Sequence, residues 1–198
     1  MIKLIFATNN QHKVQEIQSA IGSVFEVVSL EAAGITIDIP EPYDTLDENA
    51  SAKSQTIFRL TGQNCFSEDT GLEVFALNGE PGVKSARYAG EEKSFEKNID
   101  KLLSRLGGVA DRRARFRTVV SLIWQGEEFR FEGISEGTIT GERKGSQGFG
   151  YDPVFLPGGS SLTFGEMGLD EKNKFSHRRK AADKLVVFLR KRGLKSEV

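Results

Sequence analysis

The 198-residue sequence is poor in the residues that form disulfides and soft-metal sites, since it contains one cysteine and two histidines. One cysteine cannot form an intramolecular disulfide, and with two histidines it cannot complete the usual ligand set of a structural zinc site. A disulfide-stapled domain and a zinc-binding module are therefore excluded. This cysteine usage is typical of a reducing compartment, so we expect a cytoplasmic location.

An excess of charge of one sign is also absent, because 27 Lys and Arg residues face 28 Asp and Glu residues, for a formal net charge of -1. No global field would draw such a chain to nucleic acid or to an acidic membrane surface. The apolar runs are too short to span a membrane, and the N-terminal one is too short for the core of a signal peptide. We expect a soluble intracellular protein with no membrane partner and no nucleic-acid partner.

The hydrophobic pattern predicts a mixture of strands and helices. Apolar runs predict strands at 3–8, 25–30, 72–77, 114–124, 128–139 and 152–156, and helical spacing predicts helices at 14–21, 45–60, 95–106 and 176–191. The two long strands on either side of 125–127 predict a long β-hairpin. We therefore expect one domain over 1–198, of mixed α/β class, with two lobes around a central sheet and a cleft between them.

Residues 8–13, TNNQHK, lie where the first predicted strand passes into a helix. Thr8, Asn9 and Asn10 are all suitable N-cap residues, and the N–H groups and dipole of a helix N-terminus favour an anion. Lys13 adds a positive charge, so the segment suits a phosphate, although it lacks the glycines of a Walker A loop. The alternative is an ordinary polar cap with a solvated lysine.

The segment SEDTG at 67–71 places Glu68 beside Asp69 between two apolar stretches. A strand projects neighbouring side chains to opposite faces, so both carboxylates reach one metal ion only at a strand end or a turn. Gly71 favours such a turn, and Glu41 offers a third carboxylate. Oxygen ligands of this kind, completed by substrate phosphates and water, are typical of Mg²⁺ sites. The alternative is an acidic turn on the surface.

A glycine-rich segment, GSQGFGYDP at 145–153, allows close approach of the backbone to a ligand. Phe149 and Tyr151 offer aromatic faces on which a base can stack. The glycine spacing is not a dinucleotide fingerprint, because a strand-like segment follows it. The alternative is a mobile loop with one core phenylalanine.

The start of the last predicted helix gathers cations. Ser176 is a good N-cap, and Lys172, His177 and Arg178 cluster around it, where the helix dipole disfavours positive charge. Such cations favour an anionic or carbonyl partner. The alternative for His177 is an exposed, inert side chain.

Two further features are interpreted as structural. The run Arg112, Arg113, Arg115 and Arg117 matches a solvated strand face, because alternate residues of a strand share one face. Cys65 has apolar neighbours and is expected to be packed rather than reactive.

Taken together, these segments resemble the inosine triphosphatase family, the non-canonical purine nucleoside triphosphate pyrophosphatases. The resemblance covers nearly the whole chain: ATNNQHKVQEI at 7–17, ENASAK at 48–53, SEDTGLEVFALNGEPGVKSARYAG at 67–90, GFGYDPVF at 148–155 and SHRRKA at 176–181. Each segment alone is weak evidence for the family, but the whole set in this order is specific to it. This sequence differs by Glu68 and Thr70 where the family usually has aspartate and serine, and by Arg179 where glycine is common.

The resemblance implies hydrolysis of ITP, dITP and XTP to the monophosphate and pyrophosphate by Mg²⁺-assisted attack of water, which cleanses the nucleotide pool. It also implies an elongated two-lobed fold and a homodimer. Asp69 is implied as the proton acceptor, Glu41 and Asp69 as Mg²⁺ ligands, and Glu68 as a further candidate ligand. Substrate contacts are implied for Thr8, Asn9, Asn10, Gln11, His12, Lys13, Lys53, Thr70, Phe149, Gly150, Tyr151, Asp152, Lys172, Ser176, His177 and Arg178.

The chemistry of the residues agrees with this activity, since phosphoryl transfer needs charge neutralisation and an oriented water rather than a covalent nucleophile. Hypoxanthine and xanthine present a 6-oxo acceptor where adenine presents an amino donor, so donors such as Arg178 or backbone N–H groups would reject ATP. Two alternatives stay open. One is a pyrimidine-preferring pyrophosphatase, and the other is a non-catalytic binder of nucleotide or single-stranded nucleic acid that uses the arginines at 112–117.

Overall fold

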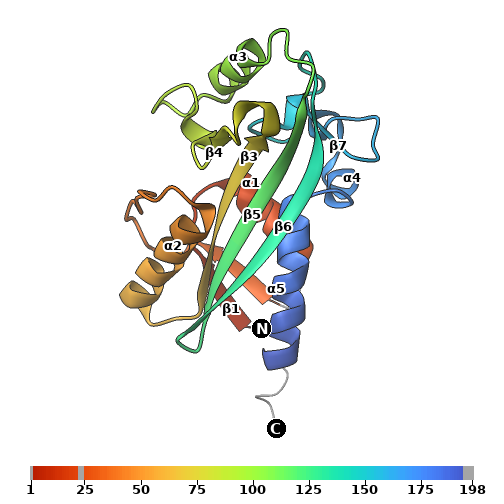
Figure 1. The fold of residues 1–198 in the computed structure, drawn as a ribbon. Coiled ribbons are helices and arrows are strands. Elements are labelled where there is room, and N and C mark those ends of the chain that lie inside the picture. The colour runs from red at the N-terminus through yellow and green to blue at the C-terminus, as the bar shows by residue number, and fades with distance from the viewer. Residues whose placement is uncertain (1, 22–24, 194–198) are drawn as a thin grey trace. The chain divides into compact units, whose positions relative to one another are not determined.

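The computed structural model describes residues 2–21 and 25–193 and divides them into two compact units (Figure 1). The first unit takes in residues up to 69, together with 118–133 and the chain from 178 onward, and the second takes in 70–117 and 134–177. No helix within the described ranges is long and apolar enough to cross a membrane. The prediction of a single domain over 1–198, and that of a cleft between lobes, stay predictions.

The strands form one seven-stranded sheet in the order β2-β1-β3-β5-β6-β7, with β4 paired to β3. β1 lies parallel to β2 and to β3, whereas β4 and β7 are antiparallel to their partners. The sheet is therefore mixed, which confirms the predicted mixed α/β class. The strands are β1 (Ile2–Phe6), β2 (Phe25–Ser29), β3 (Cys65–Val74), β4 (Pro81–Gly82), β5 (Arg113–Trp124), β6 (Glu127–Ile139) and β7 (Phe155–Pro157).

The predicted helices are confirmed to within a few residues, and their caps explain where two of them begin. The side chain of Thr45 accepts a hydrogen bond from the N–H of Glu48, and Ser94 accepts one from Lys97. The α-helices are α1 (Gln11–Ile21), α2 (Leu46–Thr61), α3 (Phe95–Arg105), α4 (Leu169–Asn173) and α5 (His177–Gly193), with 3₁₀ turns at Phe75–Leu77, Ser85–Arg87, Asp152–Val154 and Phe164–Glu166. Helix α4 was not predicted.

The long hairpin is confirmed, with β5 and β6 joined by Gln125 and Gly126. Both residues have positive φ, 52° and 86°, as a two-residue turn that matches the twist of the flanking strands requires.

The turn expected at Gly71 is wrong, because β3 runs without a break from Cys65 to Val74. The glycine serves a close approach instead: a Cβ on Gly71 would lie 2.7 Å from the carbonyl oxygen of Gly82 in β4. The strand expected at 152–156 is also shifted, since residues 152–154 form a 3₁₀ turn and β7 begins at Phe155.

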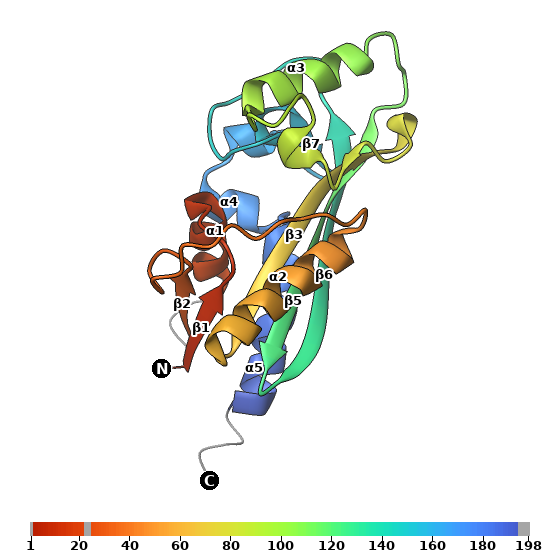
Figure 2. The same cartoon turned by 90° about the vertical axis from the view of Figure 1, so that its left-hand side faces the viewer.

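Alternation along the strands gives the first unit two apolar layers. Phe66 and Val120 belong to a cluster with residues of α1 and α5, whereas Cys65 and Ile123 belong to a cluster with Ile57 of α2. Figures 1 and 2 accordingly place α2 and α5 on opposite sides of the strands. Even-numbered side chains of this part of β3 therefore meet α1 and α5, and odd-numbered ones meet α2.

Candidate active site

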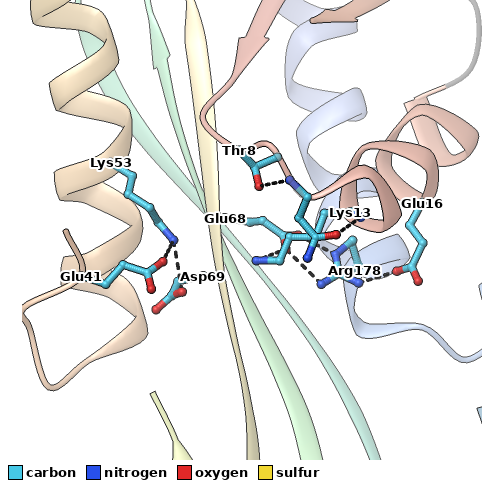
Figure 3. A network of polar contacts seen from close by, with 9 residues as sticks. Thr8, Lys13, Glu16, Glu41, Lys53, Glu68, Asp69 and Arg178 are labelled. Carbon is cyan, nitrogen blue, oxygen red and sulfur yellow. Dashed lines mark hydrogen bonds and ion pairs between the residues drawn. The ribbon is translucent and has the colours of Figure 1, made fainter. Parts of the chain in front are cut away.

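Glu68 and Asp69 project from opposite faces of β3 (Figure 3). Both are buried, with 2% and 7% of their surface exposed. The expectation that a turn brings the two carboxylates to one metal ion is therefore wrong, because a continuous strand separates adjacent side chains by its pleat. Each carboxylate instead meets cations from the helices on its own face.

On the α1 and α5 side, Glu68 lies between two cations. Its oxygens accept hydrogen bonds from Arg178 Nε at 2.7 Å and Nη2 at 3.0 Å, and Lys13 Nζ lies 2.9 Å from Oε1. Burial alone would raise the pKa of Glu68, but Arg178 and then Lys13 outweigh it and hold the pKa well below its usual range. Glu68 is therefore an ionised carboxylate that organises two cations.

The same arginine reaches a second buried carboxylate, because Arg178 Nη1 donates to Glu16 Oε2 of α1. Sequence reasoning did not select Glu16. The signal was present, however: Glu16 follows Lys13 by three residues in α1, and this spacing puts both side chains on one helix face.

On the α2 side, Lys53 Nζ bridges two carboxylates, at 2.5 Å from Glu41 Oε1 and 3.2 Å from Asp69 Oδ1 (Figure 3). The lysine faces the sheet because it shares a helical stripe with the buried Ala50 and Ile57. Burial alone would lower the pKa of Lys53, but Asp69 and Glu41 raise it above its usual value, so the group is a cation. Burial raises the pKa of Asp69 despite this lysine.

A polar cluster that the sequence did not reveal ties α2 to the hairpin. Ser54 Oγ lies 2.7 Å from Ser121 Oγ, which donates to Glu128 Oε1 at 2.9 Å, and Ser51 Oγ donates to Glu128 Oε2 at 3.1 Å. These side chains flank Lys53 in α2, so the cluster sets the rotation of the helix that presents the lysine.

The segment 8–13 forms the predicted helix cap. Thr8 Oγ1 accepts a hydrogen bond from the N–H of Asn10 at 3.2 Å, and Asn10 Oδ1 accepts one from the N–H of Lys13 at 3.2 Å. Asn9 Oδ1 accepts from the N–H of Glu31 at 2.9 Å. Gln11 and His12 are exposed in the first turn of α1. The polar side chains thus shape the turn, and binding of phosphate to it stays a prediction.

The other predicted substrate residues belong to the second unit. Asp152 Oδ2 accepts hydrogen bonds from Lys172 Nζ at 2.7 Å and from the N–H of Phe149 at 2.8 Å, and both charged groups are buried. Gly148 permits this closure, because a Cβ there would lie 2.0 Å from Asp152 Oδ2. The Tyr151 hydroxyl donates to the carbonyl of Ser85 at 2.9 Å.

At the start of α5, His177 stacks on Phe116 with 4.6 Å between ring centroids and 15° between planes. It is 2% exposed, so the alternative of an exposed, inert histidine is wrong. Ser176 is buried as well, Gly150 adopts a positive φ of 62°, and Thr70 is partly buried in β3.

The two features interpreted as structural keep that role in the fold. Cys65 is buried as predicted, and burial raises the pKa of its thiol to about 12. The alternation predicted for the arginine run is confirmed, since Ala114 and Phe116 are buried, whereas Arg113 is exposed and Arg115 and Arg117 are half-buried. Arg112 donates to the carbonyls of Leu106, Ile139 and Thr140, and Arg115 Nε lies 2.6 Å from Glu73 Oε2.

The described residues contain no group of three or more His, Cys, Asp or Glu side chains that could hold a metal ion. Glu41 and Asp69 nevertheless direct an oxygen each at one point, which the Lys53 ammonium occupies. Mg²⁺ is commonly held by one or two carboxylates that substrate phosphates and water complete. This pair of oxygens fits such a site. Glu68 does not contribute to it, because its side chain lies on the other face of β3.

A mixed α/β fold that brings buried carboxylates and lysines together beside a helix N-terminus is typical of enzymes that act on anionic substrates. The chain belongs to the Ham1 family, whose model matches residues 4–188. The resemblance found in the sequence is thereby confirmed.

Its relatives match over nearly their whole length. The dITP/XTP pyrophosphatase of Christiangramia forsetii is 49% identical over 190 residues, covering 96% of this chain and 100% of the relative. That of Porphyromonas gingivalis is 50% identical over 96% of this chain and 98% of its own. Among solved structures, the Staphylococcus aureus Ham1 protein has a TM-score of 0.87 at 39% identity, covering 96% of this chain and 99% of that one.

Proposed function

We propose that this enzyme hydrolyses ITP, dITP and XTP between the α and β phosphates, releasing the monophosphate and pyrophosphate and so cleansing the nucleotide pool. The observation that carries the activity is the full-length identity of 49% and 50% to two relatives named dITP/XTP pyrophosphatase. Hydrolysis of non-canonical purine nucleoside triphosphates is the activity of this chain. The roles of its individual residues are our proposal.

Asp69 accepts the proton of the attacking water in this proposal. Its burial supports this role, because burial raises the pKa of Asp69 and so makes the carboxylate a better proton acceptor. The ammonium of Lys53, 3.2 Å from Oδ1, favours the ionised form that can accept the proton. Glu41 and Asp69 hold the Mg²⁺. When bound, the metal supplies charge neutralisation for the phosphates and the leaving pyrophosphate.

Lys13 and the start of α1 bind the phosphates, because ammonium and helix N–H groups together favour an anion. Lys53 assists them. For the base and sugar, the candidates remain Phe149, Gly150, Tyr151 and Asp152, with Thr70, Lys172, Ser176 and His177 as further substrate contacts.

Two predicted roles change in this proposal. Glu68 is left out of the metal site, since its oxygens accept from Arg178 and Lys13 on the other face of β3. Arg178 acts as a positioning residue, because its Nε, Nη1 and Nη2 atoms donate to Glu68 and Glu16. Rejection of ATP then depends on other donors, among them backbone N–H groups.

The test is to incubate the purified protein with ITP, XTP, ATP, GTP, dTTP and UTP, with and without Mg²⁺, and to separate pyrophosphate from orthophosphate. We expect Mg²⁺-dependent pyrophosphate release from ITP and XTP. Orthophosphate release, or equal turnover of ATP and ITP, would contradict the proposal. Preference for dTTP or UTP would favour the pyrimidine alternative, and binding without turnover would favour the non-catalytic one.

A homodimer and a cytoplasmic location are part of the same proposal. Light scattering of the purified protein measures the first, and fractionation of cells measures the second. A monomer at micromolar concentration, or recovery outside the cytoplasmic fraction, would contradict the respective part.

A further inference from the structure

The Lys53 ammonium lies where a metal ion is proposed to bind. It is 2.5 Å from Glu41 Oε1 and 3.2 Å from Asp69 Oδ1, and only 5% of the lysine is exposed. Two carboxylates that converge on one point repel each other unless a cation lies between them. The Lys53 ammonium lies between these two carboxylates and supplies such a cation.

Occupation of the same point by the ammonium and by a divalent cation is mutually exclusive. Mg²⁺ binds carboxylate oxygens at about 2.0–2.1 Å, so a metal ion that bridges Glu41 Oε1 and Asp69 Oδ1 would lie at the point where the Lys53 ammonium now lies. Repulsion between the two positive charges adds to this competition in a site that little water screens. Entry of a metal ion at this point therefore requires the ammonium to move away from it.

The helix backbone does not have to move for this exchange. Ser54 and Ser51 of α2 are held to the hairpin by Ser121 and Glu128, on either side of Lys53 in the sequence. The lysine stem, in contrast, has four rotatable bonds and a compact charge that readily changes partner. We therefore expect the side chain, and not the helix backbone, to move in this exchange.

We propose that Lys53 is a stand-in cation, which bridges Glu41 and Asp69 in the nucleotide-free enzyme and transfers to the substrate's polyphosphate when a divalent cation replaces it. The inference rests on the metal site of the proposed function. In this role the lysine weakens binding of the metal ion alone. It favours binding of the metal ion together with the polyphosphate, because the polyphosphate gives the displaced ammonium a partner.

The experiment measures the affinity of the nucleotide-free protein for Mn²⁺ alone, by electron paramagnetic resonance of free Mn²⁺. Lys53→Met keeps the length of the stem and removes the competing charge. We expect it to bind Mn²⁺ about tenfold more tightly than the wild type, the effect of a close charge pair at a poorly screened site. Lys53→Gln, whose amide is neutral and can still donate to one carboxylate, should also bind more tightly and serves if the methionine variant does not fold.

Lys13→Met is the matched control, because it removes the same charge from the other face of β3. We expect less than about a threefold change in Mn²⁺ affinity for it, since the charge of Lys13 acts on Asp69 less strongly than that of Lys53. If the folded Lys53 variants bind Mn²⁺ no more tightly than the wild type, the stand-in role is wrong. It is also wrong if Lys13→Met tightens Mn²⁺ binding as much as Lys53→Met does. Failure of both folded Lys53 variants to bind Mn²⁺ overturns it as well.

The variants Asp69→Asn and Glu41→Gln show whether the proposed metal site is wrong or only the role of Lys53. If Mn²⁺ binds these variants as tightly as the wild type, the proposed ligands are wrong. If they lose Mn²⁺ binding while Lys53→Met leaves it unchanged, the metal site stands and the stand-in role does not.

Discussion

Replacement of Arg178 by methionine tests whether the buried ionic network of the first unit stabilises the fold. The guanidinium is 2% exposed and donates to Glu68 at 2.7 and 3.0 Å and also to Glu16. Methionine fills much of the same volume but leaves two buried carboxylates without the cation that they share. The perturbation is therefore the loss of charge compensation rather than the creation of a cavity.

The expected cost follows from the burial of both partners. Removal of one member of a buried ion pair costs about 3–5 kcal/mol of unfolding free energy, because the remaining charge stays desolvated. Arg178 serves two carboxylates, but Lys13 still lies 2.9 Å from Glu68 Oε1, so we expect a value near the middle of that range. With an m-value of about 2 kcal/mol/M, the urea midpoint should fall by about 2 M.

The assay is urea unfolding followed by circular dichroism, with Arg179→Met as the matched control. Arg179 is the next residue in α5, and its ion pair with Asp183 is exposed, with side chains 36% and 51% accessible. Exposed pairs contribute about 0–1 kcal/mol, so this control should hardly move the midpoint.

A double variant separates the ionic effect from other consequences of the substitution. Glu16→Gln in the Arg178→Met background neutralises the buried carboxylate that accepts from Arg178 Nη1, and we expect it to recover at least about 1 kcal/mol. Two results would refute the reasoning: a cost for Arg178→Met no larger than that for Arg179→Met, or no recovery in the double variant.

Three further predictions concern the active site, the glycine loop and the response to acid. Asp69→Asn should lower kcat by about 10²–10⁴ at saturating Mg²⁺, measured as pyrophosphate release, and retained turnover would remove Asp69 from the base role. Gly148→Ala should destabilise the protein in urea by more than Gly150→Ala, because both glycines have positive φ but only the Cβ at 148 would collide, at 2.0 Å from Asp152 Oδ2; equal losses would argue against the close approach. Burial alone would raise the pKa of Glu128, but hydrogen bonds led by Arg130 lower it, so this carboxylate contributes stability above its unfolded pKa that is lost as the pH falls through the lower folded value. Glu128→Gln should therefore lose less stability than the wild type between pH 6 and pH 3, which urea midpoints at the two pH values measure, and an unchanged difference would contradict this assignment.

Local signals in the sequence determined most of the secondary structure. The cap at Thr45 and the Gln125–Gly126 turn depend on groups a few residues apart, so they can be identified from adjacent letters. The glycine at 71 shows the limit of such signals. A glycine after polar residues predicts a turn, but the same residue also serves the close approach of Gly82, and only the folded sheet distinguishes the two uses.

The sequence by itself also determined the chemical inventory of the candidate site: carboxylates, lysines and an arginine in segments that resemble one enzyme family. Only the tertiary structure decided which of them meet. Glu68 and Arg178 are 110 positions apart in the chain, and Glu16 was not selected because its partner comes from another helix. The physical reason lies in β3. Its pleat sends adjacent carboxylates to opposite faces, and the helix packed on each face supplies the cation that each carboxylate meets.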